Sequence, residues 1–172
     1  MKQWISRAVS LLCGCGLLLL VSCGTGGGAA PAVTRGFTAD AAAAYGEMTL
    51  QGKVRCAPDG KLQLTVSQPK SLSGVTIGWD GTDMTMELAG TSVKIPPEKV
   101  PESAFINELL AVLTAEHPVG QSTDEGTAFT GQVNGMAYTL VCDADSGLPK
   151  SLSVPENEMT VTFSNVAVWS GE

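Results

Sequence analysis

Cysteine is the residue in this sequence whose chemistry is easiest to place. Cys23 stands at a sharp boundary, where the apolar run LLLLV gives way to the glycine-rich stretch GTGGG. A thiolate is the best nucleophile among the side chains here, and alkylation converts it to a stable thioether. The position of Cys23 therefore predicts covalent attachment of a lipid.

The residues before Cys23 have the pattern of a signal peptide for export. Lys2 and Arg7 precede an uncharged run of 14 residues at 8–21, and no acidic residue occurs in the first 22 positions. A helix of this length spans only about 21 Å at about 1.5 Å per residue. Because a membrane-spanning helix needs about 20 apolar residues, residues 1–22 predict a cleaved signal rather than a span.

The tetrapeptide LVSC at 20–23 resembles the bacterial lipobox, which places the cleavage between Ser22 and Cys23. Each buried methylene contributes about 0.8 kcal/mol, so two or three acyl chains give lasting attachment. We therefore expect an extracytoplasmic protein held at the cell membrane by its lipid. The alternative is an ordinary signal-peptide cysteine, which is our interpretation of Cys13 and Cys15.

The charge of the chain excludes some classes of partner. The net charge is −7, and removal of residues 1–22 takes away Lys2 and Arg7 and no acid, which leaves −9. A surface of this charge is repelled by nucleic acid and by anionic lipid headgroups. We therefore expect no nucleic-acid partner, and the membrane contact is expected to come from the lipid anchor.

Two cysteines remain in the body of the chain. Cys56 and Cys142 both occupy alternating apolar positions of predicted strands. Outside the reducing cytosol a disulfide is permitted, and closing so long a loop would contribute about 4 to 5 kcal/mol. Two buried thiols would pack nearly as well, so a disulfide and free thiols both stay open.

The body of the chain is predicted to be mainly β. Turn signals such as Asn134-Gly135 and Asp80-Gly81 separate stretches in which apolar and polar residues alternate. We predict about nine strands, near 46–57, 61–68, 73–80, 83–89, 91–95, 127–133, 136–143, 149–154 and 159–165. Residues 24–36 have no apolar period and are predicted to be a flexible tether.

Two segments are predicted to be helical. In FTADAAAAY at 37–45, four alanines have high helix propensity and Thr38 could cap the start. In PESAFINELLAVLTA at 101–115, apolar residues recur at helical spacing, with Pro101 at the start. The wide apolar side of the second helix predicts that it packs against the concave face of a curved sheet.

One short sequence is repeated in the chain: the pentapeptide PKSLS occurs at 69–73 and again at 149–153. In both places a proline follows a predicted strand or turn, so each copy is predicted to mark a corner of the chain. A duplicated hairpin and a loop used twice for binding are the other interpretations.

The order of these elements resembles that of a known family. The pattern begins with an Ala-rich helix that ends in Tyr45, followed by the strands EMTLQGKV and LTVSQPKSLSGVTI, a central helix, and the stretch GMAYTLVCDADSGLPKSLSV followed by MTVTFSNV. It looks like the superfamily of bacterial lipoprotein-sorting factors, the LolA/LolB-like fold. The resemblance covers about residues 37–166. It implies an α+β domain at 37–168 that is an incompletely closed antiparallel β-barrel wrapped around a central helix, with a short tail at 169–172. Members of that superfamily bind acyl chains or act as sensor modules.

Other residues with chemical potential have ordinary explanations. His117 is the one histidine, and its place after the predicted helix favours contact with the helix carbonyls over a catalytic role. The spacing of Asp143 and Asp145 superficially resembles that of a calcium-binding loop. A turn in which aspartate side chains accept hydrogen bonds from backbone amides is the better interpretation. Two carboxylates could in principle act as an acid and a base, and the candidates are Glu47, Asp83, Glu87, Asp124 and Glu125. Nothing in the sequence brings two of them together, so we expect a solvated acidic surface. No cofactor, metal or enzyme motif occurs, so we expect neither catalysis nor a cofactor.

Two functions remain open from the sequence. The barrel could bind an apolar ligand such as an acyl chain, with Phe105, Leu109 and Leu113 of the helix as contacts. The alternative is an envelope sensor or scaffold with a filled core that binds another protein, with Trp79 or Trp169 as a candidate aromatic anchor. An exposed apolar patch at the open edge of the sheet would favour the second function.

Overall fold

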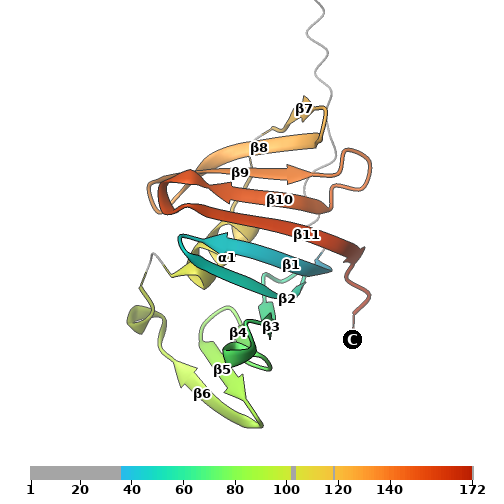
Figure 1. The fold of residues 1–172 in the computed structure, drawn as a ribbon. Helices are drawn as coiled ribbons and strands as arrows, with labels where there is room; N and C mark the ends of the chain where they lie inside the picture. Colours follow the sequence, from blue (N-terminus) through green and yellow to red (C-terminus); the bar gives the residue numbers. More distant parts are fainter. Residues whose placement is uncertain (1–35, 102–103, 118, 172) are drawn as a thin grey trace, which may run out of the picture.

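The structure is a computed structural model that describes residues 36–101, 104–117 and 119–171. Its main feature is one antiparallel sheet of eleven strands in the order β6-β5-β4-β3-β2-β1-β11-β10-β9-β8-β7 (Figure 1). The bounds are β1 (Phe37–Tyr45), β2 (Met48–Cys56), β3 (Leu62–Gln68), β4 (Thr76–Trp79), β5 (Met84–Leu88), β6 (Thr91–Ile95), β7 (Gln121–Thr123), β8 (Gly126–Val133), β9 (Met136–Cys142), β10 (Pro149–Val154) and β11 (Met159–Val168). The first and last strands of the sequence pair with each other in its middle.

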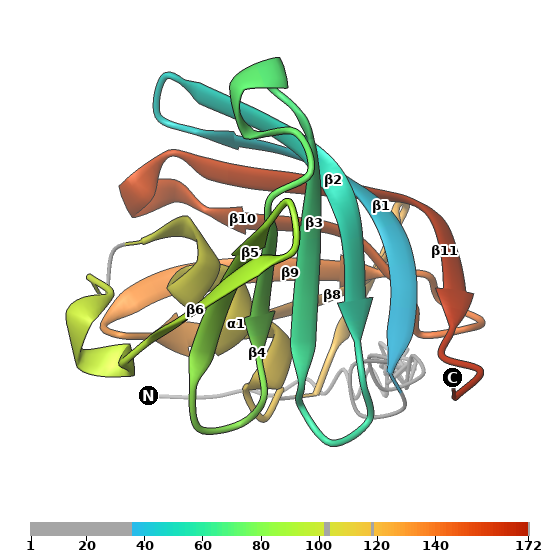
Figure 2. The ribbon, with the colours of Figure 1, turned by 90° about the horizontal axis from the view of Figure 1, so that it is seen from below.

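The sheet curves around the single α-helix of the described chain, α1 (Phe105–Thr114), which lies on its concave side (Figure 2). The described residues also form three short 3-10 helices in connections between strands and helix, namely η2 (Lys70–Leu72), η3 (Pro97–Lys99) and η4 (Pro155–Asn157). The sheet does not close, because β6 and β7 are its two edges and do not pair with each other. The result is an open half-barrel with a helix on its inner face.

The period of two in the sequence places one face of each strand in the core. In β2, for example, Leu50, Gly52, Val54 and Cys56 are buried, while Gln51, Lys53 and Arg55 between them are exposed. The inner faces of the strands and one side of α1 together form one apolar cluster. Thr, Ser, Gln and Lys side chains cover much of the outer face of β2 and β3.

The predicted helix at 37–45 is wrong, because these residues form β1, which pairs along its length with β2 and with β11. Thr38 is therefore a strand residue and caps no helix. Alanine favours a helix by only a few tenths of a kcal/mol per residue over most others. That preference is outweighed here, because a central strand satisfies its backbone on both sides and buries Phe37, Ala39, Ala41 and Ala43.

The other predicted elements are confirmed in type. All nine predicted strands exist, as β2 to β6 and β8 to β11, and the helix predicted at 101–115 is α1. The strand count of nine is too low, because β1 and the three-residue β7 were not predicted as strands. The described domain begins with β1 at Phe37, and its last strand ends at Val168.

The two copies of PKSLS have different structures. The first copy forms η2 in the connection between β3 and β4, as expected for a corner, whereas the second copy lies in β10. The prediction of two corners is therefore wrong for residues 149–153. There β9 and β11 flank the segment on both sides and supply the hydrogen bonds of a strand.

Candidate functional site

The three residues predicted to contact an apolar ligand lie in the packed core. Phe105 is 9% exposed, Leu113 is 1% exposed and Leu109 is fully buried. They belong to the same apolar cluster as the inner faces of the strands, and Phe105 packs edge-on against Tyr45 with 6.1 Å between ring centroids. The side chains of α1 thus occupy the concave side of the sheet.

The inner face becomes exposed toward the β6 edge. A row of paired residues crosses the sheet from Leu64 on β3 to Ile77, Met86 and Val93. Leu64 is 1% exposed, Met86 is 40% exposed and Val93 is 56% exposed. Leu88, two residues beyond Met86 on β5, is 50% exposed. We call Met86, Leu88 and Val93 the inner strip.

A charged side chain is buried inside the half-barrel. Glu108 of α1 is fully buried, and its Oε1 accepts hydrogen bonds from Tyr45 Oη at 3.5 Å and from Asn157 Nδ2. Its Oε2 has no hydrogen-bond partner in the described part of the chain. Burial raises the pKa of the Glu108 carboxyl, because an ion loses hydration there, while the two hydrogen bonds act in the opposite direction.

His117 contacts side chains of β8 and β9. Its Nδ1 is 2.9 Å from Tyr138 Oη, and its ring packs against Phe129. Burial lowers the pKa of His117, which favours the neutral ring. The sequence favoured contact with the helix carbonyls, whereas the hydrogen bond is made to Tyr138. No serine or cysteine side chain is hydrogen-bonded to this ring in the described structure.

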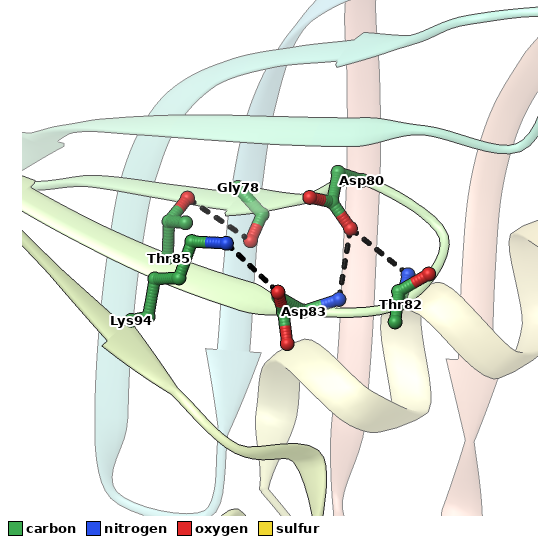
Figure 3. Close-up of polar contacts among 6 residues, drawn as sticks. All are labelled: Gly78, Asp80, Thr82, Asp83, Thr85 and Lys94. Carbon is green, nitrogen blue, oxygen red and sulfur yellow. Dashed lines mark hydrogen bonds and ion pairs between the residues drawn. The ribbon is translucent and has the colours of Figure 1, made fainter.

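A groove of about 600 Å³ lies at the end of the sheet where the β2–β3 and β4–β5 turns meet. Its floor is a row of paired outer-face residues, Arg55, Gln63, Gly78 and Thr85, on β2 to β5. Trp79 and Trp169 also line it. Thr85 donates a hydrogen bond to the Gly78 carbonyl at 3.5 Å, and a Cβ on Gly78 would collide with that hydroxyl (Figure 3).

Most charged groups around the groove are already paired. Asp80 Oδ1 accepts the amide hydrogens of Thr82 and Asp83 at 2.9 and 2.8 Å, and Lys94 Nζ lies 2.9 Å from Asp83 Oδ2 (Figure 3). On the opposite rim the Asp59 carboxylate is 2.7 Å from Lys61 Nζ.

Arg55 is the exception. It is exposed, and it makes no hydrogen bond or ion pair with the described residues. A second, smaller hollow is also lined by Arg55 and Trp169, so both residues border the two hollows at this end of the sheet.

The two cysteines of the folded part are free buried thiols. Cys56 is on β2 and Cys142 on β9, and β1, β11 and β10 lie between them. Four strand spacings are about 19 Å along the sheet, whereas a disulfide requires Cα atoms within about 7 Å. Burial raises the pKa of Cys56 to about 11 and that of Cys142 to about 12.

Asp143 forms the turn predicted for it. Its Oδ1 accepts hydrogen bonds from the amides of Asp145 and Ser146 and from the Ser146 hydroxyl. These bonds hold the pKa of Asp143 below its usual value. Among the described residues no group of three His, Cys, Asp or Glu side chains could hold a metal ion.

Two predicted site residues cannot be compared with the structure, and three features of the structure were not predicted. Ser22 and Cys23 lie outside the described residues, so their predicted processing and lipidation stay predictions. Sequence reasoning did not single out Glu108, Arg55 or the inner strip. Glu108 lies between apolar helix residues and could have been noticed at a core position, whereas the isolation of Arg55 carries no sequence signal.

Within the described residues, no helix has the length and apolar character needed to cross a bilayer. No protein-family model matches the sequence, and no curated protein matches it. Solved structures do match in fold. An uncharacterized conserved protein from Thermus thermophilus is similar over 81% of this chain and 82% of that chain, with 15% identity and a TM-score of 0.52.

Two other solved structures show a weaker likeness. For a LolA superfamily protein from Nitrosomonas europaea, identity is 12% and the TM-score is 0.46, over 81% of this chain and 88% of that chain. For a DUF1329 family protein from Desulfovibrio piger, identity is 13% and the TM-score is 0.43, over 80% of this chain and 87% of that one. At these identities the likeness concerns the fold alone, which in this chain is an open antiparallel half-barrel.

Proposed function

We propose that the chain is an extracytoplasmic protein anchored to the cell membrane by lipid on Cys23, and that its half-barrel binds another envelope protein. The inner strip is the observation that carries this proposal. Met86, Leu88 and Val93 are 40%, 50% and 56% exposed, although they lie on the same face as the buried core. Covering apolar area is favourable by about 25 cal/mol per Å², so a partner gains free energy there.

The edge of the sheet adds a second means of attachment. In the described part of the chain, β6 pairs with β5 on one side and with no strand on the other. Its free backbone groups can hydrogen-bond to an extended segment of a partner. The opposite edge, β7, has only three residues and all three are exposed and polar. This asymmetry favours the β6 edge as the binding side.

The packed interior favours a protein partner over an acyl chain. Leu109 and Leu113 are buried within the core cluster, so an acyl chain beside α1 would have to displace them. We also propose that the protein is not an enzyme. The support is that His117 is bonded to Tyr138 rather than to a nucleophile.

A photocrosslinking residue in the full-length lipoprotein tests this function. Val93 belongs to the inner strip, whereas Ser92, its neighbour on β6, points to the opposite face of the sheet. In the cells that make the protein, we expect a crosslinker at 93 to capture one partner protein in stoichiometric amount, and a crosslinker at 92 to capture much less. Val93→Asp should abolish copurification of that partner, while Ser92→Asp should preserve it.

Two results would contradict the proposal. One is equal crosslinking from positions 92 and 93, with copurification unchanged by Val93→Asp. The other is a stoichiometric acyl lipid in an organic extract of the purified protein, beyond the lipid that is covalently attached. The second result would support the apolar-ligand function instead.

A further inference from the structure

The groove lies at the end of the domain where the expected anchor joins. Phe37 pairs with Cys56 and with Val168, and the Trp169 amide donates a hydrogen bond to the Gly36 carbonyl at 3.2 Å. In Figure 2 the start of β1, the end of β11 and the β2–β3 and β4–β5 turns lie together at the bottom of the view. Cys23 is 13 residues before Gly36, so a lipid on it is within about 45 Å of this end even when the chain is fully extended.

This end offers an open position for an anion. Arg55 is exposed and makes no ion pair with the described residues. Its planar guanidinium can donate two parallel hydrogen bonds to a phosphate. Asp80 offers the opposite charge, because Oδ1 accepts the two turn amides and Oδ2 accepts no hydrogen bond from the described chain.

The local charge permits approach to a membrane, although the whole molecule is acidic. The groove is lined by two cations, Arg55 and Lys61, and two carboxylates, Asp59 and Asp80. The surface there is neutral on balance, so it suits a headgroup that itself has one positive and one negative charge. Phosphatidylethanolamine has such a headgroup, with its phosphate matched to Arg55 and its ammonium matched to Asp80.

Trp169 completes the surface. It is half-buried and, like Arg55, lines both hollows at this end. An indole combines an apolar ring with an N–H donor, which is why tryptophan is enriched at the level of lipid headgroups.

We propose that this end of the half-barrel docks onto the bilayer, with Arg55 binding the phosphate of a zwitterionic phospholipid headgroup and Trp169 lying in the interfacial layer. The inference rests on the proposed anchor at Cys23 and adds the direction in which the domain faces. Leu88 lies four residues along β5 from Met84, or about 14 Å further from this end. The inner strip therefore stays accessible to a partner.

Fluorescence quenching tests the docking on the processed, lipidated protein. Trp4 is removed with the signal, so in a Trp79→Phe variant Trp169 is the remaining tryptophan. The protein is placed in vesicles of phosphatidylethanolamine and phosphatidylcholine in which part of the phosphatidylcholine has brominated acyl chains. We expect bromine to quench Trp169. Arg55→Gln should lower the ratio of docked to undocked protein by ~10-fold, since a hydrogen bond to a charged group is lost.

Lys53→Gln is the matched control. It removes the same charge from the same face of β2, two residues from Arg55, and Lys53 does not line the groove. Its quenching should equal that of the parent protein. Absence of quenching in the parent, or equal quenching in Arg55→Gln, would overturn the docking. If Trp79→Phe does not fold, the difference between the spectra of wild-type and Trp169→Phe protein gives the same signal.

Failure of the anchor can be told apart from failure of the docking. The mass of the processed chain and its flotation with vesicles report lipidation directly, whatever the environment of Trp169. An unlipidated chain would overturn the anchor. A lipidated chain whose Trp169 stays in water would overturn only the docking.

Discussion

At the scale of single residues, the most unusual feature is the fully buried carboxyl of Glu108, because charged side chains are rarely fully buried. Its Oε2 has no partner in the described structure, and burial raises its pKa above the usual value of 4.5. Because the pKa is higher in the folded than in the unfolded state, Glu108 contributes stability that is fully present below the unfolded pKa. That stability is lost as the pH rises through the folded pKa.

We therefore predict that Glu108→Gln makes the protein more stable than wild type at neutral and mildly alkaline pH. The substitution should also remove part of the fall in unfolding free energy that occurs as the pH rises above the ordinary carboxyl pKa of 4.5. Glutamine keeps an oxygen for Tyr45 and Asn157 without a buried charge. Urea denaturation at several pH values measures this. Glu116→Gln, at an exposed position just beyond α1, is the control. Parallel pH profiles for wild type and Glu108→Gln would contradict the prediction.

At the scale of elements, prediction from the sequence was wrong where pairing with distant strands outweighed the local conformational preference of the residues. The run of alanines at 41–44 has the composition of a helix, yet it lies in the central strand β1. PKSLS forms a 3-10 turn between β3 and β4 and a strand between β9 and β11. In both cases the backbone partners come from residues far along the chain, which local propensity does not describe.

Substitutions in the helix α1 test whether its apolar side chains pack in the core or line a ligand cavity. Leu109 is fully buried, whereas Leu110 is only partly buried on the same helix. We predict that Leu109→Ala lowers the unfolding free energy by about 2 to 5 kcal/mol, because it removes buried area and leaves a cavity. Leu110→Ala, with the same change of side chain, should cost clearly less. Thermal and urea denaturation measure both costs, and equal costs would mean that Leu109 does not lie in a packed core.

At the scale of the whole molecule, the half-barrel separates two surfaces. The groove with Arg55 and Trp169 lies at the end where the described chain begins, and the inner strip lies further along β5 and β6. A protein held near a bilayer at the first surface presents the second to its surroundings. This arrangement unites the proposed anchor with the proposed partner binding.

The anchor itself gives a prediction for the whole molecule. Cys23→Ala should prevent lipid attachment and move the protein from the membrane fraction to the soluble extracytoplasmic fraction, because Cys23 is the predicted nucleophile. Cell fractionation with immunoblotting measures this, and Cys15→Ala serves as the matched control because Cys15 lies within the predicted signal. A Cys23→Ala protein that is processed and membrane-bound to the same extent as wild type would refute the anchor.

The sequence alone determined the nine strands β2 to β6 and β8 to β11, the position of α1 and the turn at Asp143. These follow from apolar periodicity and turn chemistry, which act over a few residues. Only the tertiary structure decided that β1 is a strand, that Cys56 and Cys142 lie apart, and that Phe105, Leu109 and Leu113 fill the interior. The same holds for the hollows that Arg55 and Trp169 both line and for the exposure of the inner strip. Strand order and sheet closure depend on pairings between residues far apart in the sequence.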